Sequence, residues 1–330
     1  GTVTITYSLT QENSSYSTGT GMINNQDPLF INKSDQDGAD NGWITADDGL
    51  NICDYSPAYQ TGTSSGAPTT DITGTTRGLS PSMGAYEGII TSVHYVKTTA
   101  SGTGDGSSWT NATTLQAAIN ASSAGDRIFV TAGTYYPTGY PAGVTSKDTR
   151  DYAFYLNKDI KIYGGFANTG TPSWGSRNSS SNPVILSGNI NVGGTATNDC
   201  YHVFITDGLS SAAVLDGVTI TGGNANGSGG ITYSGLTYSQ GNGGGMYTYL
   251  SSPTLTNVTI SGNTATYGGG MYNSSSSPTF TDVTIDSNSA TNGGGMSNFF
   301  YATPRLTHVT ISGNTATAFG GGMFNSYSSD

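Results

Sequence analysis

Short runs of hydrophobic residues recur at a constant spacing in the last third of the sequence. The motif GGGM closes each repeat and ends at Met246, Met271, Met296 and Met323, in steps of 25, 25 and 27 residues. Between these motifs, β-branched and aromatic runs are bounded by Gly, Asn, Ser and Pro, which is typical of strands separated by tight turns. A fixed period of this length predicts a solenoid of stacked repeats.

The hydrophobic positions within a repeat predict one coil of a parallel β-helix. The matching residues are Leu255, Val258 and Ile260, then Phe280, Val283 and Ile285, then Leu306, Val309 and Ile311. A repeat of this size accommodates roughly three strands of ~5 residues with their turns, and the coils stack at about 4.8 Å. The crossover rule for parallel strands sets the handedness. We therefore predict an all-β fold, a right-handed parallel β-helix.

Stacking in register places equivalent residues in ladders along the axis. Val258, Val283 and Val309 are expected to line the interior. Two asparagine ladders are expected in the turns, one of Asn263, Asn288 and Asn314 and one of Asn273, Asn298 and Asn325. Asparagine suits such turns because it tolerates a left-handed backbone and because stacked amides hydrogen-bond along the axis. The triple glycine suits a corner where Cβ atoms would collide.

Composition agrees with this fold and restricts the possible partners. Glycine accounts for 49 of 330 residues and only 9% are charged, which suits short strands and turns better than helices. The net charge is −11, and the ten Lys and Arg residues are scattered singly. Because no basic stripe could neutralise phosphates, nucleic acid is not an expected partner. No apolar run approaches ~18 residues, so no membrane span is expected.

Two further features concern processing and redox state. The sequence starts with neither a Met nor a signal peptide, so we expect a mature product or a portion of a longer chain. Cys53 and Cys200 are too few for a disulfide framework. They could form a single bridge in an exported protein or remain free structural thiols.

The first 90 residues carry a characteristic order of motifs. Residues 1–10 alternate as a strand, with Val3, Ile5, Tyr7 and Leu9 on one face. DPLF follows at residues 27–30, then a DxDGxD loop at 35–40, SPA at 56–58 and GAYE at 84–87. This order resembles the closing segment of bacterial surface β-helix proteins of the choice-of-anchor Q domain type. The resemblance covers about residues 3–88.

A second segment, at residues 94–138, resembles the opening of the same family. It holds a first strand, a Gly-rich loop with Asp105 and Trp109, a short helix near residues 115–121, and the strand and turn AGDRIFVTAGTYYP. Leu115, Ala118 and Ile119 lie at helical spacing and are expected to cover the open end of the first coil. We therefore predict closing coils and an acidic loop in residues 1–90, and the opening cap with the main coils in residues 91–330.

A family C-terminus thus precedes a family N-terminus in this sequence. If Asp330 is joined to Gly1, Met323 lies 16 residues before Leu9, whereas Met and the matching Ile are 14, 14 and 15 residues apart within the repeats. We expect one period of a longer array, or subunits meeting end to end. The expected junction residues are Val3, Ile5, Tyr7, Leu9, Met323 and Asn325.

The acidic loop is a candidate calcium site. Its candidate ligands are Asp35, Asp37, Asp40, Asn41, Asp47 and Asp48. Alternate acidic side chains around a glycine can fold about a hard cation that takes six to eight oxygens. The alternative is that these residues only form Asx-turns in water. Calcium is the one cofactor that the sequence suggests.

Catalytic chemistry finds little support. The motifs NTD, GHG and RIK of polygalacturonases are absent, and no paired DD occurs within the repeats. Asp282 takes the position of Asn257 and His308 in neighbouring coils, which indicates a tolerant outward position. His202 is expected in a strand with a structural role.

Aromatic residues gather near the GGGM corners, where they either pack in ladders or contact sugars and partners: Tyr233, Tyr238, Tyr247, Tyr249, Tyr267, Tyr272, Phe299, Phe300, Tyr301 and Tyr327.

These observations favour an extracellular or cell-surface structural protein without enzymatic activity. Its expected partners are copies of itself, joined head to tail into a filament by β-strand continuation. A surface adhesin that binds glycans or proteins is the alternative, and a polysaccharide lyase or hydrolase comes third.

Overall fold

The computed structural model describes residues 9–10, 23–24, 52, 58–59, 61–65, 67–72, 74, 76–83, 92–140, 144, 148–190, 199–233 and 236–326. The chain divides into two compact units, Gly1–Thr91 and Ser92–Asp330. Within the described part of the chain, no helix is long and apolar enough to cross a membrane.

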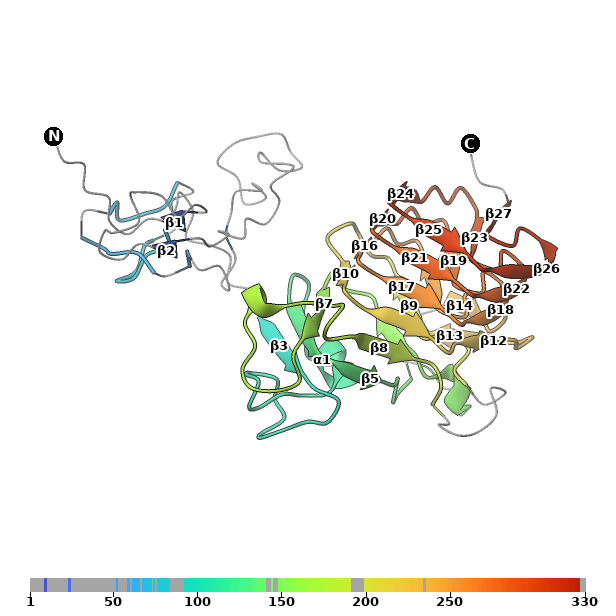
Figure 1. The fold of residues 1–330 in the computed structure, drawn as a ribbon, viewed down its shortest axis with the longest axis horizontal. Coiled ribbons are helices and arrows are strands. Elements are labelled where there is room, and N and C mark those ends of the chain that lie inside the picture. Colours follow the sequence, from blue (N-terminus) through green and yellow to red (C-terminus); the bar gives the residue numbers. More distant parts are fainter. Residues whose placement is uncertain are drawn as a thin grey trace. The chain divides into compact units, whose positions relative to one another are not determined.

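The second unit is a right-handed parallel β-helix, as the sequence predicts. Its strands stack in four parallel sheets, and each turn of the chain adds one strand to the next sheet, so that the colours of Figure 1 run in order along the stack. The first sheet comprises β3 (Val93–Val96), β4 (Arg127–Thr131), β7 (Lys161–Phe166), β10 (Val214–Asp216), β16 (Thr254–Thr256), β20 (Thr279–Thr281) and β24 (Arg305–Thr307). The second comprises β5 (Gly133–Tyr135), β8 (Val184–Ser187), β11 (Thr219–Thr221), β17 (Thr259–Ser261), β21 (Thr284–Asp286) and β25 (Thr310–Ser312).

The other two sheets complete each coil. The third comprises β12 (Asn224–Ala225), β18 (Thr264–Tyr267), β22 (Ser289–Asn292) and β26 (Thr315–Phe319). The fourth comprises β6 (Phe154–Leu156), β9 (Phe204–Asp207), β15 (Met246–Tyr249), β19 (Met271–Ser274), β23 (Met296–Phe299) and β27 (Met323–Ser326). An antiparallel hairpin, β13 (Gly230–Tyr233) with β14 (Leu236–Ser239), is inserted before β15.

Pairing in register builds the interior. Ile260 pairs with Ile285 and Ile285 with Ile311, so equivalent side chains stack along the axis. Val258 and Val283 are buried in one continuous hydrophobic core, and Val309 packs against it half-buried. The predicted valine ladder therefore lies inside the helix.

Each repeat holds four short strands, where about three were expected from its length. Residues 254–274 form β16, β17, β18 and β19, of three or four residues each. Strands this short leave room for a fourth, because the corners between them need only two to four residues.

The triple glycine makes a corner where side chains do not fit, as predicted. A Cβ on Gly244 would lie 2.3 Å from the Thr264 carbonyl oxygen, and a Cβ on Gly245 would lie 2.5 Å from the Gly270 carbonyl oxygen. Gly243 has a φ of +65°, in the left-handed region. Successive coils therefore approach backbone to backbone at this corner.

A different ladder from the predicted one takes the left-handed backbone conformation. Asn257, Asp282 and His308, at the corner between the first and second sheets, have φ values of 52°, 55° and 51°. The asparagines of the two predicted ladders are not among the residues with positive φ. The expectation that the ladder asparagines supply left-handed turns was therefore wrong, because their amides bond along the axis from an ordinary backbone.

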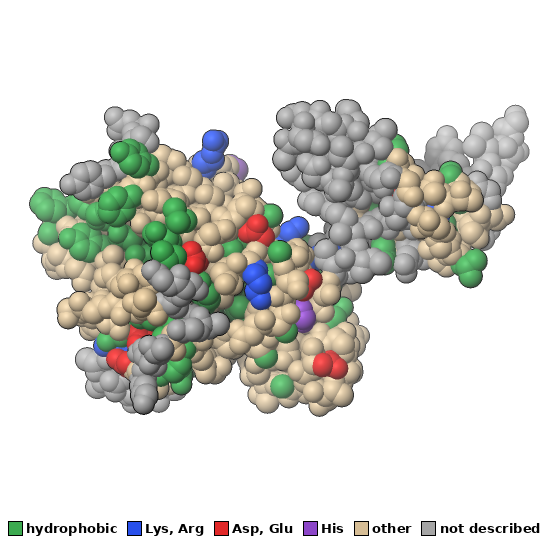
Figure 2. Space-filling view, turned by 180° about the vertical axis from the view of Figure 1, so that it is seen from behind, with side chains coloured by type: hydrophobic (Ala, Val, Ile, Leu, Met, Phe, Trp, Pro, Cys, Tyr) green, Lys and Arg blue, Asp and Glu red, His purple; other side chains and the backbone are tan. Residues whose placement is uncertain are grey.

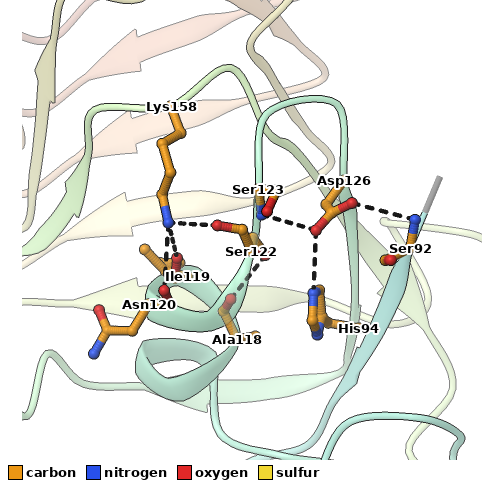
Figure 3. A network of polar contacts seen from close by, with 9 residues as sticks. All are labelled: Ser92, His94, Ala118, Ile119, Asn120, Ser122, Ser123, Asp126 and Lys158. Atoms are coloured by element: carbon orange, nitrogen blue, oxygen red, sulfur yellow. Dashed lines mark hydrogen bonds and ion pairs between the residues drawn. The ribbon is translucent and has the colours of Figure 1, made fainter.

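The predicted capping helix is present as α1 (Leu115–Ala121). It buries Leu115, Ala118 and Ile119 against the first coil, and the Thr114 hydroxyl accepts a hydrogen bond from the Ala117 N–H at its start. At its end, the Lys158 ammonium donates to the carbonyls of Ile119, Asn120 and Ser122 (Figure 3). These last carbonyls lack helical partners, and a cation at a helix C-terminus also matches the helix dipole.

Asp126 connects the cap to the first strand. Its carboxylate accepts from the N–H groups of Ser92 and Ser123 and lies 3.5 Å from His94 Nε2 (Figure 3). Because these contacts join the start of β3 to the turn before β4, the first coil is fixed at the capped end.

The segment of residues 168–182 folds back onto the body of the β-helix. It contains a 3-10 helix (Trp174–Ser176), and the Trp174 ring packs on Phe129 and Tyr163. A second 3-10 helix spans Thr149–Asp151. These apolar contacts explain why the segment does not extend into solvent.

The first unit is described in part. β1 (Leu9–Thr10) pairs in parallel with β2 (Ile23–Asn24), in the register Leu9 with Ile23. Parallel pairing of strands so close in sequence is the arrangement of a small coil.

Candidate functional site

The candidate site is the end of the β-helix at the last coil, formed by β24, β25, β26 and β27. Each of these strands is the terminal strand of its sheet in the described part of the chain. The backbone shows what an added coil would pair with: the N–H groups of Gly293, Gly294, Gly295 and Met296 donate to carbonyls of the following coil. The same positions in the last coil are residues 320–323. This row of donors and the strands beside it define an open edge.

The last coil also exposes residues whose equivalents are buried. Leu306 is 42% exposed, whereas Leu255 and Phe280 in the same column are 0% exposed. Ile311 and Met323 are half-buried, whereas Ile285 and Met296 are fully buried. Among the described residues, the core positions of the last coil are therefore more exposed than their equivalents in the preceding coils.

The first predicted asparagine ladder leads to this edge. The Asn263 N–H and Nδ2 both donate to Asn288 Oδ1 at 3.0 Å, and the Asn288 N–H and Nδ2 donate to Asn314 Oδ1 at 2.9 and 3.0 Å. Each Nδ2 also donates to a carbonyl of the preceding coil, as Asn288 does to Ile260 at 2.9 Å. The structure brings all three residues together: Asn288 bonds Asn263 and Asn314, and the Nδ2 of each residue also bonds a backbone carbonyl.

The second predicted ladder lies inside the fourth sheet. Asn273 Nδ2 donates to Asn298 Oδ1, and Asn298 Nδ2 donates to Asn325 Oδ1, both at 2.8 Å. Asn325 is exposed on β27, the edge strand. Both ladders therefore run in one direction and finish at the open edge.

Two threonines extend the second ladder toward the capped end, and the sequence analysis missed them. Thr206 pairs with Thr248 and Thr248 with Asn273. Thr206 Oγ1, Thr248 Oγ1 and Asn273 Oδ1 are buried and have no hydrogen-bond partner among the described protein groups. Alignment on the GGGM motif would have found Thr248, because it stands two residues after Met246 as Asn273 does after Met271.

Most of the predicted aromatic group packs on the outside of the fourth sheet. The Tyr247 ring lies 5.0 Å from Tyr272 and 5.3 Å from Tyr238, which belongs to the hairpin of β13 and β14. All three rings share one buried hydrophobic cluster. Burial raises the pKa of Tyr247 to about 12. This part of the group is a packed ladder.

Toward the last coil the aromatic group becomes exposed. Phe300 is 52% exposed, Tyr301 75% and Phe319 66%. The Phe299 ring lies 5.5 Å from Tyr267 and 5.8 Å from Phe324. Figure 2 shows hydrophobic side chains gathered over the last coils. The side chains of Tyr233 and Tyr327 lie outside the described part.

His202 and Cys200 are buried in the wall of the helix. His202 lies two residues before β9 instead of in a strand, and its Nδ1 lies 3.1 Å from the Gly243 carbonyl oxygen. Burial lowers the pKa of His202 to about 4, so the imidazole is neutral at pH 7 and Nδ1 donates to the carbonyl. Cys200 is a free buried thiol, and burial raises its pKa. Both residues therefore have structural environments.

An ion pair between Arg177 and Asp216 joins two segments whose contact was not predicted from the sequence. The Arg177 guanidinium lies 2.7 Å from Asp216 and also packs over the rings of Tyr163 and Trp174. Because the guanidinium is held by these contacts, it fastens residues 168–182 to β10. Asp282 lies 3.3 Å from His308 in an exposed pair.

Several predicted residues cannot be placed. Within the described ranges, no group of three or more His, Cys, Asp or Glu could hold a metal ion. Outside the described ranges lie Asp35, Asp37, Asp40, Asn41, Asp47, Asp48, Cys53, Val3, Ile5 and Tyr7. The calcium site and the cysteine bridge therefore stay predictions.

Comparison with known proteins adds little beyond the fold. No family model and no curated protein matches the sequence. Among solved structures, the crystal structure of pectate lyase Pel9A matches with 19% sequence identity and a TM-score of 0.38. The match covers 64% of this chain and 44% of the lyase chain, so it spans less than half the length of that protein. The strand pairing itself defines the class: the chain is a parallel β-helix protein.

Proposed function

We propose that this chain is an extracellular structural protein, the repeat unit or subunit of a filament in which the open edge of one copy pairs with the first unit of another. The observation that carries the proposal is the last coil, where Leu306, Ile311 and Met323 are uncovered in the positions of buried residues. Burying one such side chain stabilises by about 1.5–3 kcal/mol. A coil added at this edge therefore gains hydrophobic burial as well as main-chain hydrogen bonds.

The occupant proposed for this edge is a second copy because the first unit has matching features. Its residues 1–10 alternate apolar and polar positions in the sequence, and β1 pairs in parallel with β2. Parallel addition is the geometry that the open edge requires, since all four sheets are parallel. A contact between two different surfaces of identical chains propagates without closing unless its rotation forms a ring.

Assembly and its dependence on the edge test this proposal. Sedimentation velocity over a range of concentrations and electron microscopy are expected to show linear oligomers of the wild-type chain. On β26, the Thr315 N–H donates to the Asn288 carbonyl of the preceding coil. Successive N–H groups of a strand point to opposite sides, so the Ala316 N–H points away from β22, toward the place of an added coil. Ala316→Pro removes that donor. This variant is expected to stay folded and to assemble less, whereas Thr315→Ala, which keeps the backbone, assembles normally. A wild-type chain that stays monomeric at high concentration refutes the proposal.

A second candidate function is adhesion to glycans or proteins, which the exposed Phe300, Tyr301 and Phe319 favour. Exposed aromatic rings provide flat apolar surface for partners. Saturable glycan binding by the Ala316→Pro monomer, lost in Tyr301→Ala, would support it. We further propose that the chain has no enzymatic activity. Incubation with acidic and neutral polysaccharides is expected to give no chain shortening.

A further inference from the structure

The tripeptide Val-Thr-Ile occurs five times in the sequence, at residues 3–5, 218–220, 258–260, 283–285 and 309–311. The last four copies occupy one position of the coil, with the threonine opening β11, β17, β21 or β25 of the second sheet. Their isoleucines stack in register along the axis. The copy at residues 3–5 therefore has the sequence of a second-sheet strand.

The spacing to the next strand supports the same assignment. In each coil, the strand of the third sheet begins five residues after the strand of the second: β18 starts at Thr264 after Thr259, and β26 at Thr315 after Thr310. Five residues after Thr4 is Leu9, the first residue of β1 that the structure describes. β1 has β2 as a parallel neighbour, and parallel pairing is shared by all four sheets of the second unit. The Val-Thr-Ile tripeptide and the spacing to β1 thus fit one register.

We propose that residues 3–10 of a second copy complete the last coil, with residues 3–5 paired to β25 and β1 paired to β26. This inference rests on the proposed function and adds the partner segment and its register. Ile5 then stacks on Ile311 in the interior, and Thr10 takes the inward position of Ala316. Alignment from the GGGM motif instead places Leu9 on Ile311, four residues away.

The two registers predict opposite effects of the substitution Tyr7→Gly on assembly. In the register proposed here, Tyr7 follows Gly313 and Ser287 at a corner where φ is 61° and 56°. A tyrosine is strained there, so Tyr7→Gly is expected to strengthen assembly roughly tenfold. In the alternative register, Tyr7 lies beside the half-buried Val309, and the same substitution would weaken assembly by removing an apolar side chain.

Cysteine cross-linking tests the register directly. Full-length single-cysteine variants are made in a Cys53→Ser, Cys200→Ala background, mixed in pairs and oxidised. Paired residues on neighbouring parallel strands have Cα atoms about 4.8 Å apart, within the range of a disulfide, whereas four residues along a strand span about 13 Å. Thr4→Cys mixed with Thr310→Cys is expected to shift to a disulfide-linked dimer on a non-reducing gel. Ser8→Cys mixed with Thr310→Cys, the pair of the alternative register, is expected to remain monomeric.

The outcomes separate the register from the assembly itself. A dimer from the first mixture with stronger assembly of Tyr7→Gly supports the inference. A dimer only from the second mixture, or assembly without either cross-link, overturns the register and leaves the filament standing. If the background chain does not assemble while the wild type does, the cross-links are repeated with Cys200 retained, because that thiol is buried. Absence of assembly in the wild type overturns both proposals.

Discussion

Truncation of one ladder asparagine, Asn288→Ala, is expected to be among the most damaging single substitutions in the second unit. Asn288 is 1% exposed and stands between two coils. Its Oδ1 accepts from the N–H and Nδ2 of Asn263, and its Nδ2 donates to Ile260 O and Asn314 Oδ1. Alanine removes all four hydrogen bonds but leaves in place the partner groups on Asn263, Ile260 and Asn314.

The expected loss follows from the groups left without partners. Asn263 Nδ2 keeps the carbonyls of Ile220 and Ser261, and Asn314 Oδ1 keeps the Asn288 N–H. The Asn263 N–H loses its acceptor, and the Ile260 carbonyl loses the amide donor. Each buried polar group left unsatisfied costs about 1–3 kcal/mol. The free energy of unfolding should therefore fall by roughly 2–5 kcal/mol, or about 4–20 °C in Tm for a unit of this size.

Thermal and chemical unfolding of the full chain measure this loss, with Asn325→Ala as the matched control. Asn325 accepts a single hydrogen bond from Asn298, and it is exposed on the edge strand, where water can replace it. Its truncation should cost less than about 1 kcal/mol. An Asn288→Ala variant as stable as Asn325→Ala would refute the view that the ladder joins the coils.

Three further substitutions test other parts of the fold. His202→Asn should flatten the acid limb of the stability curve: with a pKa of about 4 in the folded state against 6.5, the wild type loses roughly 3 kcal/mol as the pH falls from 6.5 to 4, because the unfolded chain takes up the proton first. An unchanged pH profile would contradict this. Gly270→Ala should destabilise by about 1–3 kcal/mol or more, since its Cβ would lie 2.6 Å from the Gly295 carbonyl oxygen, whereas Gly175→Ala meets nothing within 4 Å and should be neutral in the same melts. Thr248→Asn offers Asn273 Oδ1 a donor and should raise stability by about 1 kcal/mol; a lower Tm would show that the larger side chain does not fit.

Periodicity explains why much of the second unit could be predicted from sequence. In-register stacking turns a repeated residue into a ladder, so Asn263, Asn288 and Asn314 could be paired before any coordinates were known. The capping helix could be placed because Leu115, Ala118 and Ile119 show helical spacing in a chain otherwise patterned for strands. In both cases the signal is local or periodic, and pattern analysis detects signals of that kind.

Features made by non-periodic segments could not be predicted in the same way. Arg177 meets Asp216 across 39 residues, and no spacing rule connects them. The hairpin of β13 and β14 packs against Tyr247 only because it is inserted in one coil. The left-handed corner at Asn257, Asp282 and His308 could not be predicted because a different residue type occupies it in each coil. Asn, Asp and His share a tolerance for that backbone conformation, but they do not form a repeated motif.

The capped and open ends of the second unit restrict how a filament could be built. α1 covers the first coil, and Lys158 and Asp126 fix the cap to that coil. Because a covered end cannot accept strands, the sheets of one copy cannot continue through the next. Each β-helix would instead be closed by the first unit of the following copy, and successive bodies would be joined by the peptide link between residues 91 and 92. Such a filament is a row of separate β-helices, each completed by a neighbour, and its strength depends on both the borrowed strands and that link.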